Sequence, residues 1–336
     1  MALLASACGA AQPSSSRDDL AGLAFTRNDE NGEHPSVWVA DADGSNASRL
    51  ATDAWGGTLS PDGRQVLYSA SGGPDDERAK LYVQAVAGGK QRVLGKAVWG
   101  EWSPDSEHVV LSEAESLTFV DVDSGKRTEL THGGTGRWRS TSFSPDGKAL
   151  AFARDDGRPG HEDESDIYVV RLSDGKTERL TIDGHSDYPV WGPDWIAFRP
   201  FEFINDEHWP SFGELWLMRP DGSGKHFLAR GDEDPSMAHY GLQPLEFSAD
   251  GKRLLGCYTY EFSCPPVTFS VPDGKRYEPS IGGKPLTASD LSRDGTAILV
   301  NTGAAEGPYD VYSIPFEGGP ARLLAKQAVD ASWAGR

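Results

Sequence analysis

Three cysteines are the residues of this 336-residue chain whose chemistry follows most directly from their position. Cys8 ends a run of apolar and then small residues that begins at Met1, as does the lipidated cysteine of a lipoprotein signal. We therefore expect residues 1–8 to be a signal remnant and the Cys8 thiol to carry lipid after cleavage. Residues 9–20, rich in Ala, Pro and Ser, are expected to form a disordered tether. The alternative is a frayed cytoplasmic N-terminus with a chance cysteine.

The other two cysteines, Cys257 and Cys264, flank residues 258–263, which we interpret as the tip between two antiparallel strands. Across such a tip two Cβ atoms can approach to disulfide distance. Lipidation of Cys8 would leave an even pair, as an oxidising compartment allows. We predict a disulfide, with two half-buried free thiols as the alternative.

An insertion at residues 201–212 contains four aromatic side chains, more than a solvated loop requires. Aromatic projections commonly anchor protein interfaces. Phe203, Trp209 and Phe212 are therefore candidate partner contacts, with Trp209 and Phe212 as the anchors. The alternative is that these rings fold back over the neighbouring sheet.

Motifs for catalysis are weak. No Gly-x-Ser-x-Gly occurs, and the eight histidines are scattered, with no two at a local ligand spacing such as i, i+2 or i+4. We therefore expect no catalytic residue, metal or cofactor. The acidic loop 155–166 is interpreted as a solvated insertion, with a contact to a cation or a basic partner as the alternative. The formal charge of −19 disfavours nucleic acid, and it disfavours an anionic membrane surface except through a lipid anchor.

A recurring phrase indicates the strands and turns that would position these residues. The phrase is an aromatic residue or Leu followed by Ser-Pro-Asp-Gly or a near copy. Its second position falls at Ser60, Ser103, Ser144, Gly192, Ser248 and Ser292. The steps of 43, 41, 48, 56 and 44 residues match the period of a four-stranded propeller blade. Pro, Asp and Gly each favour a tight turn, and the preceding aromatic side chain is expected between neighbouring blades. We therefore assign the residues of the phrase a structural role and no function.

Residues just upstream of each phrase are expected to line the approach to the central tunnel. The candidates for partner binding among them are Arg137, Arg139, Asp187, Tyr188 and Tyr240, and Trp55, Trp99, His185, His239, Gln243 and Asp330 occupy similar positions. Aromatic rings, charges and amides that converge on one mouth would suit a peptide or small ligand. The alternative is that they solvate a water-filled channel.

The two ends of the chain predict how the ring closes. Residues 23–52 supply three strands of a blade without the innermost one, whereas residues 329–333 resemble an innermost strand with nothing after it. We therefore predict an all-β fold in which the C-terminal strand completes the N-terminal blade. This gives one β-propeller domain over residues 21–336 with seven four-stranded blades, six being the alternative.

Both the phrases and the strand-to-hairpin stretches at 37–46 and 215–223 resemble the TolB-like family of bacterial propellers over about residues 20 to 334. The resemblance implies an exported, non-catalytic protein that binds other proteins of the cell envelope. TolB has a separate α/β domain and a six-bladed ring, so only a TolB-like propeller lipoprotein is implied.

We accordingly expect a monomeric, lipid-anchored scaffold, periplasmic or on the cell surface, that binds a protein or peptide. The alternative is an exported carbohydrate-active or hydrolytic enzyme with its site at the tunnel mouth, as in the propellers of oligogalacturonate lyases.

Overall fold

The structure is a computed structural model and describes residues 20–28, 34–70, 80–97, 99–113, 116–131, 139–154, 164–203, 210–211, 213–231, 241–259, 263–303 and 309–335. Residues 139, 202, 203, 210 and 211 are described by their backbone alone. The described residues form strands and turns and no helix. None of these residues therefore belongs to a helix able to cross a bilayer.

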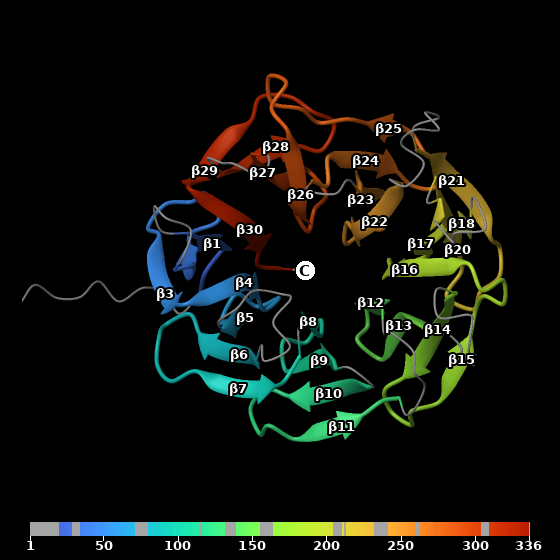
Figure 1. Cartoon of the computed structure of the whole chain (residues 1–336), viewed down its shortest axis with the longest axis horizontal. Helices are drawn as coiled ribbons and strands as arrows, with labels where there is room; N and C mark the ends of the chain where they lie inside the picture. Colours follow the sequence, from blue (N-terminus) through green and yellow to red (C-terminus); the bar gives the residue numbers. More distant parts are fainter. Residues whose placement is uncertain are drawn as a thin grey trace, which may run out of the picture.

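Seven four-stranded antiparallel sheets stand around a common axis, which confirms the predicted seven-bladed propeller (Figure 1). We number the blades along the chain and give the strands of each from the axis outward. Blade 1 consists of β30 (Ala328–Trp333), β1 (Leu23–Arg27), β2 (Ser36–Ala40) and β3 (Ser48–Thr52). Blade 2 consists of β4 (Ala54–Leu59), β5 (Gln65–Ala70), β6 (Lys80–Ala85) and β7 (Arg92–Gly95), and blade 3 of β8 (Trp99–Trp102), β9 (His108–Ser112), β10 (Leu117–Asp121) and β11 (Arg127–Glu129).

The remaining blades repeat this order. Blade 4 consists of β12 (Arg139–Phe143), β13 (Ala149–Arg154), β14 (Asp166–Arg171) and β15 (Thr177–Arg179), and blade 5 of β16 (Ser186–Trp191), β17 (Ile196–Pro200), β20 (Glu214–Met218) and β21 (His226–Arg230). Blade 6 consists of β22 (Leu242–Phe247), β23 (Arg253–Tyr258), β24 (Pro266–Ser270) and β25 (Arg276–Tyr277), and blade 7 of β26 (Leu286–Leu291), β27 (Ala297–Thr302), β28 (Asp310–Pro315) and β29 (Arg322–Lys326). The short strands β18 (Glu202–Phe203) and β19 (Pro210–Ser211) pair within the blade 5 insertion.

Blade 1 combines the first and the last strand of the described residues, as predicted. β30 pairs antiparallel with β1, with Leu23 opposite Trp333 and Arg27 opposite Ala328. The C-terminal strand thus supplies the innermost strand that residues 23–52 lack. This pairing closes the ring without leaving an open sheet edge at the seam.

The recurring phrase is a hydrogen-bonded turn between the two inner strands of a blade. In blade 4 the Ser144 hydroxyl donates to Asp146 Oδ1 (2.7 Å) and accepts from the Ala149 backbone N–H (3.0 Å). The Lys148 N–H donates to the same Asp146 oxygen (3.1 Å). Gly147 has a φ of 68°, which Gly adopts without strain. The Ser-to-Asp bond recurs at Ser60, Ser103, Ser248 and Ser292.

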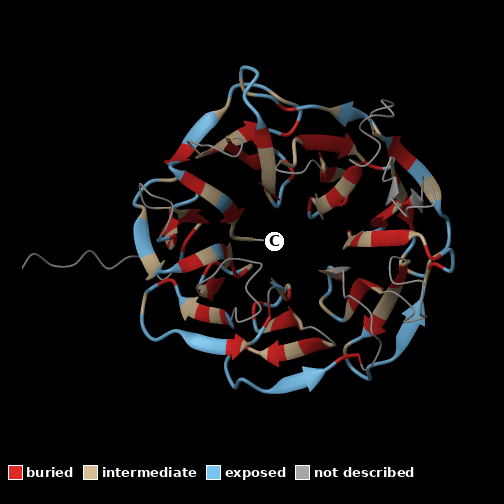
Figure 2. Cartoon of the chain, in the orientation of Figure 1, coloured by how far each residue is buried: buried red, intermediate tan, exposed pale blue. Residues whose placement is uncertain are grey.

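The core is divided among the spaces between blades. Seven buried hydrophobic clusters are present, one at each interface between neighbouring blades. The ring of Trp102 lies in the cluster between blades 2 and 3, and its indole N–H donates to the Thr58 carbonyl (3.1 Å). The aromatic residue of the phrase therefore packs between blades, as predicted. Figure 2 shows this distribution, with burial on the inner strands and exposure on the outermost ones.

A second set of contacts joins neighbouring blades through the residue that precedes this aromatic or Leu. At five of the seven junctions its side-chain oxygen accepts the backbone N–H of the equivalent aromatic or Leu in the next blade. The pairs are Ser332–Leu59 (3.0 Å), Glu101–Phe143 (3.3 Å), Ser142–Trp191 (2.9 Å), Glu246–Leu291 (3.2 Å) and Asp290–Trp333 (2.6 Å). A buried backbone donor needs such an acceptor, so these side chains contribute to blade-to-blade adhesion.

Candidate functional site

The propeller has two different faces because the strands of every blade alternate in direction. The turns that follow the innermost and third strands lie on one face, which we call the turn face, and they are short and alike. The connections that follow the second and outermost strands lie on the opposite face, which we call the loop face. The insertion at 201–213, the hairpin tip at 259–265 and the starts of all the innermost strands belong to the loop face. Binding residues concentrate in such variable loops, so the loop face is the candidate functional surface.

β-bulges mark the loop-face starts of the innermost strands. Register shifts occur in β4, β12, β16, β22, β26 and β30. Three residues at these bulges, Ser140, Tyr188 and Asp330, have φ values of 43°, 49° and 50°, which non-glycine residues rarely adopt. Bulges re-aim side chains and are frequent next to functional sites. The bulges therefore determine which side chains lie around the axis on the loop face.

We call the side chains at the loop-face starts of the innermost strands the rim. Among the described residues, Trp99 is the most exposed aromatic side chain of the rim. It begins β8 and is 65% exposed. Trp55, His185 and Gln243, at comparable positions in other blades, are half-buried. Asp330 reaches solvent, yet the protein that encloses it restricts its hydration and raises the pKa of its carboxyl group. The rim thus combines an exposed indole with a carboxyl group of weakened acidity.

Asp187 and Tyr188, two of the predicted contact residues, meet around Arg199. Asp187 is fully buried and lies directly opposite Arg199 in the pairing of β16 with β17. Arg199 donates from Nε and Nη2 to the two Asp187 oxygens, both at 2.9 Å. Its guanidinium carbon lies 4.3 Å from the centre of the Tyr188 ring. In this arrangement the Asp187 carboxylate has no surface for a partner and positions Arg199 and Tyr188 instead.

The remaining predicted contacts are only partly covered by the structure. Arg139 begins β12 on the loop face, and Phe203 lies in β18 of the blade 5 insertion. Arg137, Trp209, Phe212, Tyr240 and the lipidation candidate Cys8 lie outside the described residues, as do residues 155–163 of the acidic loop. The roles assigned to all of these residues stay predictions.

Cys257 and Cys264 form a disulfide, with their Cα atoms 5.2 Å apart. Cys257 is buried in β23, and Cys264 follows the loop-face tip between β23 and β24. The Cys264 carbonyl accepts the N–H of Ala288 in β26 (2.8 Å). The disulfide therefore fixes the hairpin tip to β23, and the backbone hydrogen bond joins this tip to the innermost strand of blade 7.

One group of possible metal ligands lies away from the loop face. Atoms of Asp105, Glu107 and His108 lie within 4.8 Å of one another. Asp105 and Glu107 belong to the turn of blade 3 and His108 begins β9 directly after it. Asp105 Oδ1 also accepts the Ser103 hydroxyl and the Glu107 N–H. The His108 ring stacks on Phe119, with ring centroids 4.4 Å apart. The group follows from a single turn and does not gather residues from several blades.

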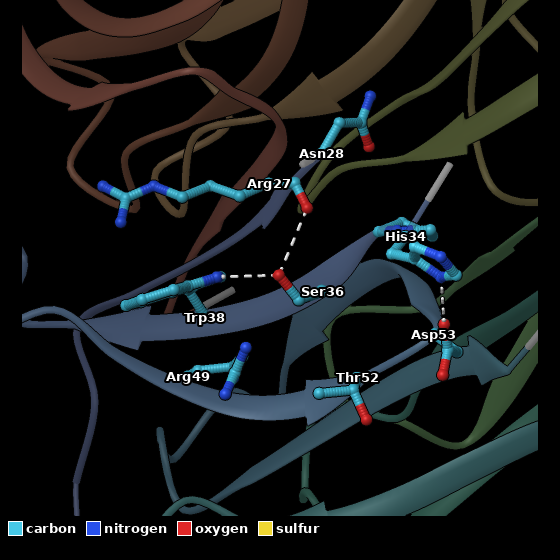
Figure 3. Close-up of a pocket in the computed structure, with 9 residues that line it drawn as sticks. Arg27, Asn28, His34, Ser36, Trp38, Arg49, Thr52 and Asp53 are labelled. Atoms are coloured by element: carbon cyan, nitrogen blue, oxygen red, sulfur yellow. Dashed lines mark hydrogen bonds and ion pairs between the residues drawn. The ribbon is translucent and has the colours of Figure 1, made fainter. Parts of the chain in front are cut away.

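A pocket at the loop-face end of blade 1 was not predicted (Figure 3). Its volume is ≈ 280 Å³, and its lining includes Arg27, Asn28, His34, Pro35, Ser36, Trp38, Arg49, Thr52 and Asp53. Ser36 is central to its hydrogen bonding, since its hydroxyl accepts from the Trp38 indole N–H (3.0 Å) and donates to the Arg27 carbonyl (3.2 Å). His34 Nδ1 lies 3.1 Å from Asp53 Oδ1. The signal that could have found the pocket is that titratable residues (Arg27, His34 and Asp53) occur at the loop-face ends of three adjacent strands.

The seven radial sheets, the closing strand and the variable loop face define a closed seven-bladed β-propeller. Residues 20–253 match the family model of the TolB β-propeller domain (PD40). The chain belongs to this family.

Similar proteins have different activities. A tricorn protease homolog from Streptomyces coelicolor is 27% identical over 348 aligned positions, which cover 90% of this chain and 29% of that protein. The structure of TolB from Acinetobacter baumannii has a TM-score of 0.56 at 14% identity, with 92% of this chain and 81% of that chain covered. An oligogalacturonate lyase in complex with manganese has a TM-score of 0.61 at 14% identity, with 91% and 85% covered. At such identities the structures show a shared fold and not a shared function.

The chain spans less than half the length of the curated relatives that it matches, the tricorn protease homolog among them. Activities and partners of those longer proteins are therefore not transferred to this chain by similarity.

Proposed function

We propose that this chain is an extracytoplasmic, non-catalytic propeller that binds a protein or peptide partner through its loop face as a monomer, with a lipid on Cys8 as its membrane anchor. The observation that carries the proposal is the separation of the two faces. The variable connections, the Trp99 rim and the disulfide-bonded hairpin tip occupy the loop face, whereas the first described residues lie on the turn face, where the Ala21 N–H donates to the Gly63 carbonyl (2.9 Å).

An anchor at Cys8 would thus attach the propeller by its turn face. Residues 9–20 could span at most about 40 Å when fully extended. A membrane-held propeller would then present its loop face away from the bilayer. This orientation suits a receptor for proteins of the cell envelope, the role that the resemblance to TolB implies.

The proposal of a binding protein over an enzyme is supported by the distribution of side chains. In the part of the chain that the structure describes, the group of possible metal ligands comes from one turn on the turn face. Asp187, the buried carboxylate of the rim, is already paired with Arg199. An exposed indole is instead typical of an interface anchor.

The test is site-specific photocrosslinking in living cells. A photoreactive amino acid at position 99 or 209, on the loop face and in the blade 5 insertion, should give a discrete adduct. The same group at Lys148, an exposed position on the turn face, is the matched control and should not. Equal capture from both faces would count against the loop face as the interface. Adducts from position 99 that are unchanged by Trp209→Ala and Phe212→Ala together would count against the insertion.

The anchor has its own readout. Cys8→Ser should move the protein from the membrane fraction to the soluble fraction. A membrane-bound Cys8→Ser variant would contradict lipid anchoring without affecting the crosslinking result.

A further inference from the structure

The two faces of the propeller differ in charge. Counted between consecutive strands of the blades, the loop-face connections contain 24 Asp and Glu and 5 Lys and Arg, a formal charge of −19. The turn-face connections contain 14 and 10, a formal charge of −4. Part of the loop-face charge belongs to residues outside the described ranges, but each connection begins and ends at a loop-face strand end. Since charges act over about 8–10 Å at moderate salt, the excess negative charge acts on this face.

Basic residues in the strands do not neutralise this charge. Among the two strand residues nearest to each end of the loop-face connections, nine are basic and six are acidic. Three of the nine are already paired with carboxylates of their own blades. These pairs are Arg179 with Asp166, Arg199 with Asp187, and Arg230 with Glu214. The loop face therefore stays strongly negative and favours a cationic partner.

The exposed indole of Trp99 points to the same chemistry independently. Trp99 is 65% exposed, and in the part of the chain that the structure describes no ring or cation lies against it. The indoles of Trp38 and Trp195, by contrast, are covered by arginines of this chain, Arg27 at 4.5 Å and Arg219 at 3.8 Å from the ring centres. An indole face is the best side-chain partner for a Lys or Arg cation. Trp99 thus offers on the loop face a contact that other tryptophans make internally.

A second exposed contact lies in the connection between β15 and β16. Ile182 is 82% exposed, and Asp183 next to it is exposed as well. Neither Asp183 nor Glu178, an exposed residue of β15, forms an ion pair among the described residues. Lys and Arg side chains combine an apolar stem with a charged head, so an apolar residue beside carboxylates suits them.

We propose that the loop face binds a Lys- or Arg-rich segment of a partner protein, with one cationic side chain on the Trp99 indole. The negative charge is distributed over connections of all seven blades, so it matches an extended basic chain better than a single small cation. In naming the chemistry of the partner, this proposal deepens the proposed function and rests on it.

The experiment is a calorimetric titration of the purified full chain with hexa-arginine. Hexacitrulline, which has nearly the same shape and no charge, is the matched probe. We expect saturable binding of hexa-arginine and at least about tenfold weaker binding of hexacitrulline, because the field of the face acts on charge. Raising the salt from about 0.05 M to about 0.5 M should weaken the binding of hexa-arginine at least about fivefold.

Variants at position 99 locate the indole contact. Trp99→Ala should weaken the binding of hexa-arginine about threefold with an unchanged melting curve, and Trp99→Phe, which keeps a ring, should lose less. Val93→Ala is the control, because it shortens an exposed apolar side chain near the turn-face end of β7 and should bind as the wild type does.

Paired charge variants test the face itself. Glu178→Gln with Asp183→Asn removes two exposed carboxylates next to a loop-face connection and should weaken binding at least about twofold. Asp194→Asn with Glu317→Gln removes two exposed carboxylates on the turn face and should have no effect.

Absence of saturable binding of hexa-arginine would overturn the proposal, as would equal binding of hexacitrulline. Wild-type affinity in Trp99→Ala, or equal effects of the two charge pairs, would overturn it as well. These results are separable from the proposed function. A partner that crosslinks from position 99 or 209 through a neutral or acidic segment would uphold loop-face binding and contradict the basic segment.

Discussion

Asp290 of blade 7 accepts the backbone N–H of Trp333 in the closing strand at 2.6 Å, and this hydrogen bond joins the last complete blade to the strand that completes the first. The Asp290 side chain is buried, and its other oxygen lies 3.0 Å from the Leu291 N–H. One carboxylate therefore supports both the end of β26 and the end of β30.

Replacement of Asp290 by alanine is expected to destabilise the ring by about 2 kcal/mol, because a buried backbone donor loses a charged acceptor. Urea denaturation followed by tryptophan fluorescence measures the change. Asp290→Asn retains an acceptor oxygen and should recover part of the loss. Equal stability of Asp290→Ala and the wild type would show that the contact does not stabilise the closure.

Removal of the closing strand should have a larger effect. Deletion of residues 328–336 removes β30, exposes the edge of β1 and opens the cluster of Leu23, Phe25 and Ala331. We expect an aggregating or strongly destabilised protein, since an unpaired apolar strand edge invites association. Thermal denaturation with light scattering measures both outcomes, and removal of Arg336 alone is the control. An unchanged melting curve after the long deletion would contradict closure by β30.

Sequence reasoning predicted the ring because each blade repeats a local signal, and the unpaired Trp333 indicated how the ends meet. The loop-face side chains are harder to predict, because their positions depend on bulges and on partners in other strands. Asp187 illustrates this, since the sequence does not reveal that Arg199 lies directly opposite. The blade 1 pocket is a stronger case: Arg27, Trp38 and Arg49 come from three strands and meet only through their register.

Gly192 occupies the second position of the recurring phrase, where the other five internal copies have Ser and the last blade-closing strand is followed by Ala334. The structure explains the difference, because a Cβ on Gly192 would lie 2.6 Å from Cγ of Phe247 in the next blade. Gly192→Ser, which restores the common residue, should therefore destabilise the protein by roughly 1–3 kcal/mol through overpacking. Urea denaturation is the measurement. The double variant Gly192→Ser with Phe247→Leu should regain stability relative to the single one, and a neutral Gly192→Ser would refute the clash.

The aspartates of the turns predict a loss of stability in acid. Hydrogen bonds from the Ser144 hydroxyl and the Lys148 N–H lower the pKa of Asp146. Equivalent bonds lower the pKa of two other turn aspartates: one from the Ser248 hydroxyl to Asp250 and one from the Thr296 N–H to Asp294. A carboxyl group with a lowered folded-state pKa contributes stability above its unfolded-state pKa of about 3.9, and this contribution is lost as the pH falls through the folded-state value. Asp146→Asn should therefore lose less stability than the wild type between pH 7 and pH 3 in urea denaturation. Parallel pH profiles for the two proteins would contradict the linkage.

The buried pair of Asp187 and Arg199 gives the largest expected effect of a single side chain on the loop face. Asp187→Ala would leave Arg199, a residue that is only 5% exposed, without its carboxylate partner. Loss of one partner of a buried pair typically costs about 3–5 kcal/mol. Because Arg199 also packs on Tyr188, the single variant should both lower stability and disturb the rim. The double variant Asp187→Leu with Arg199→Met removes both charges and should be more stable than Asp187→Ala in urea denaturation. A double variant that is no more stable than Asp187→Ala would show that the uncompensated charge is not the cause of the loss.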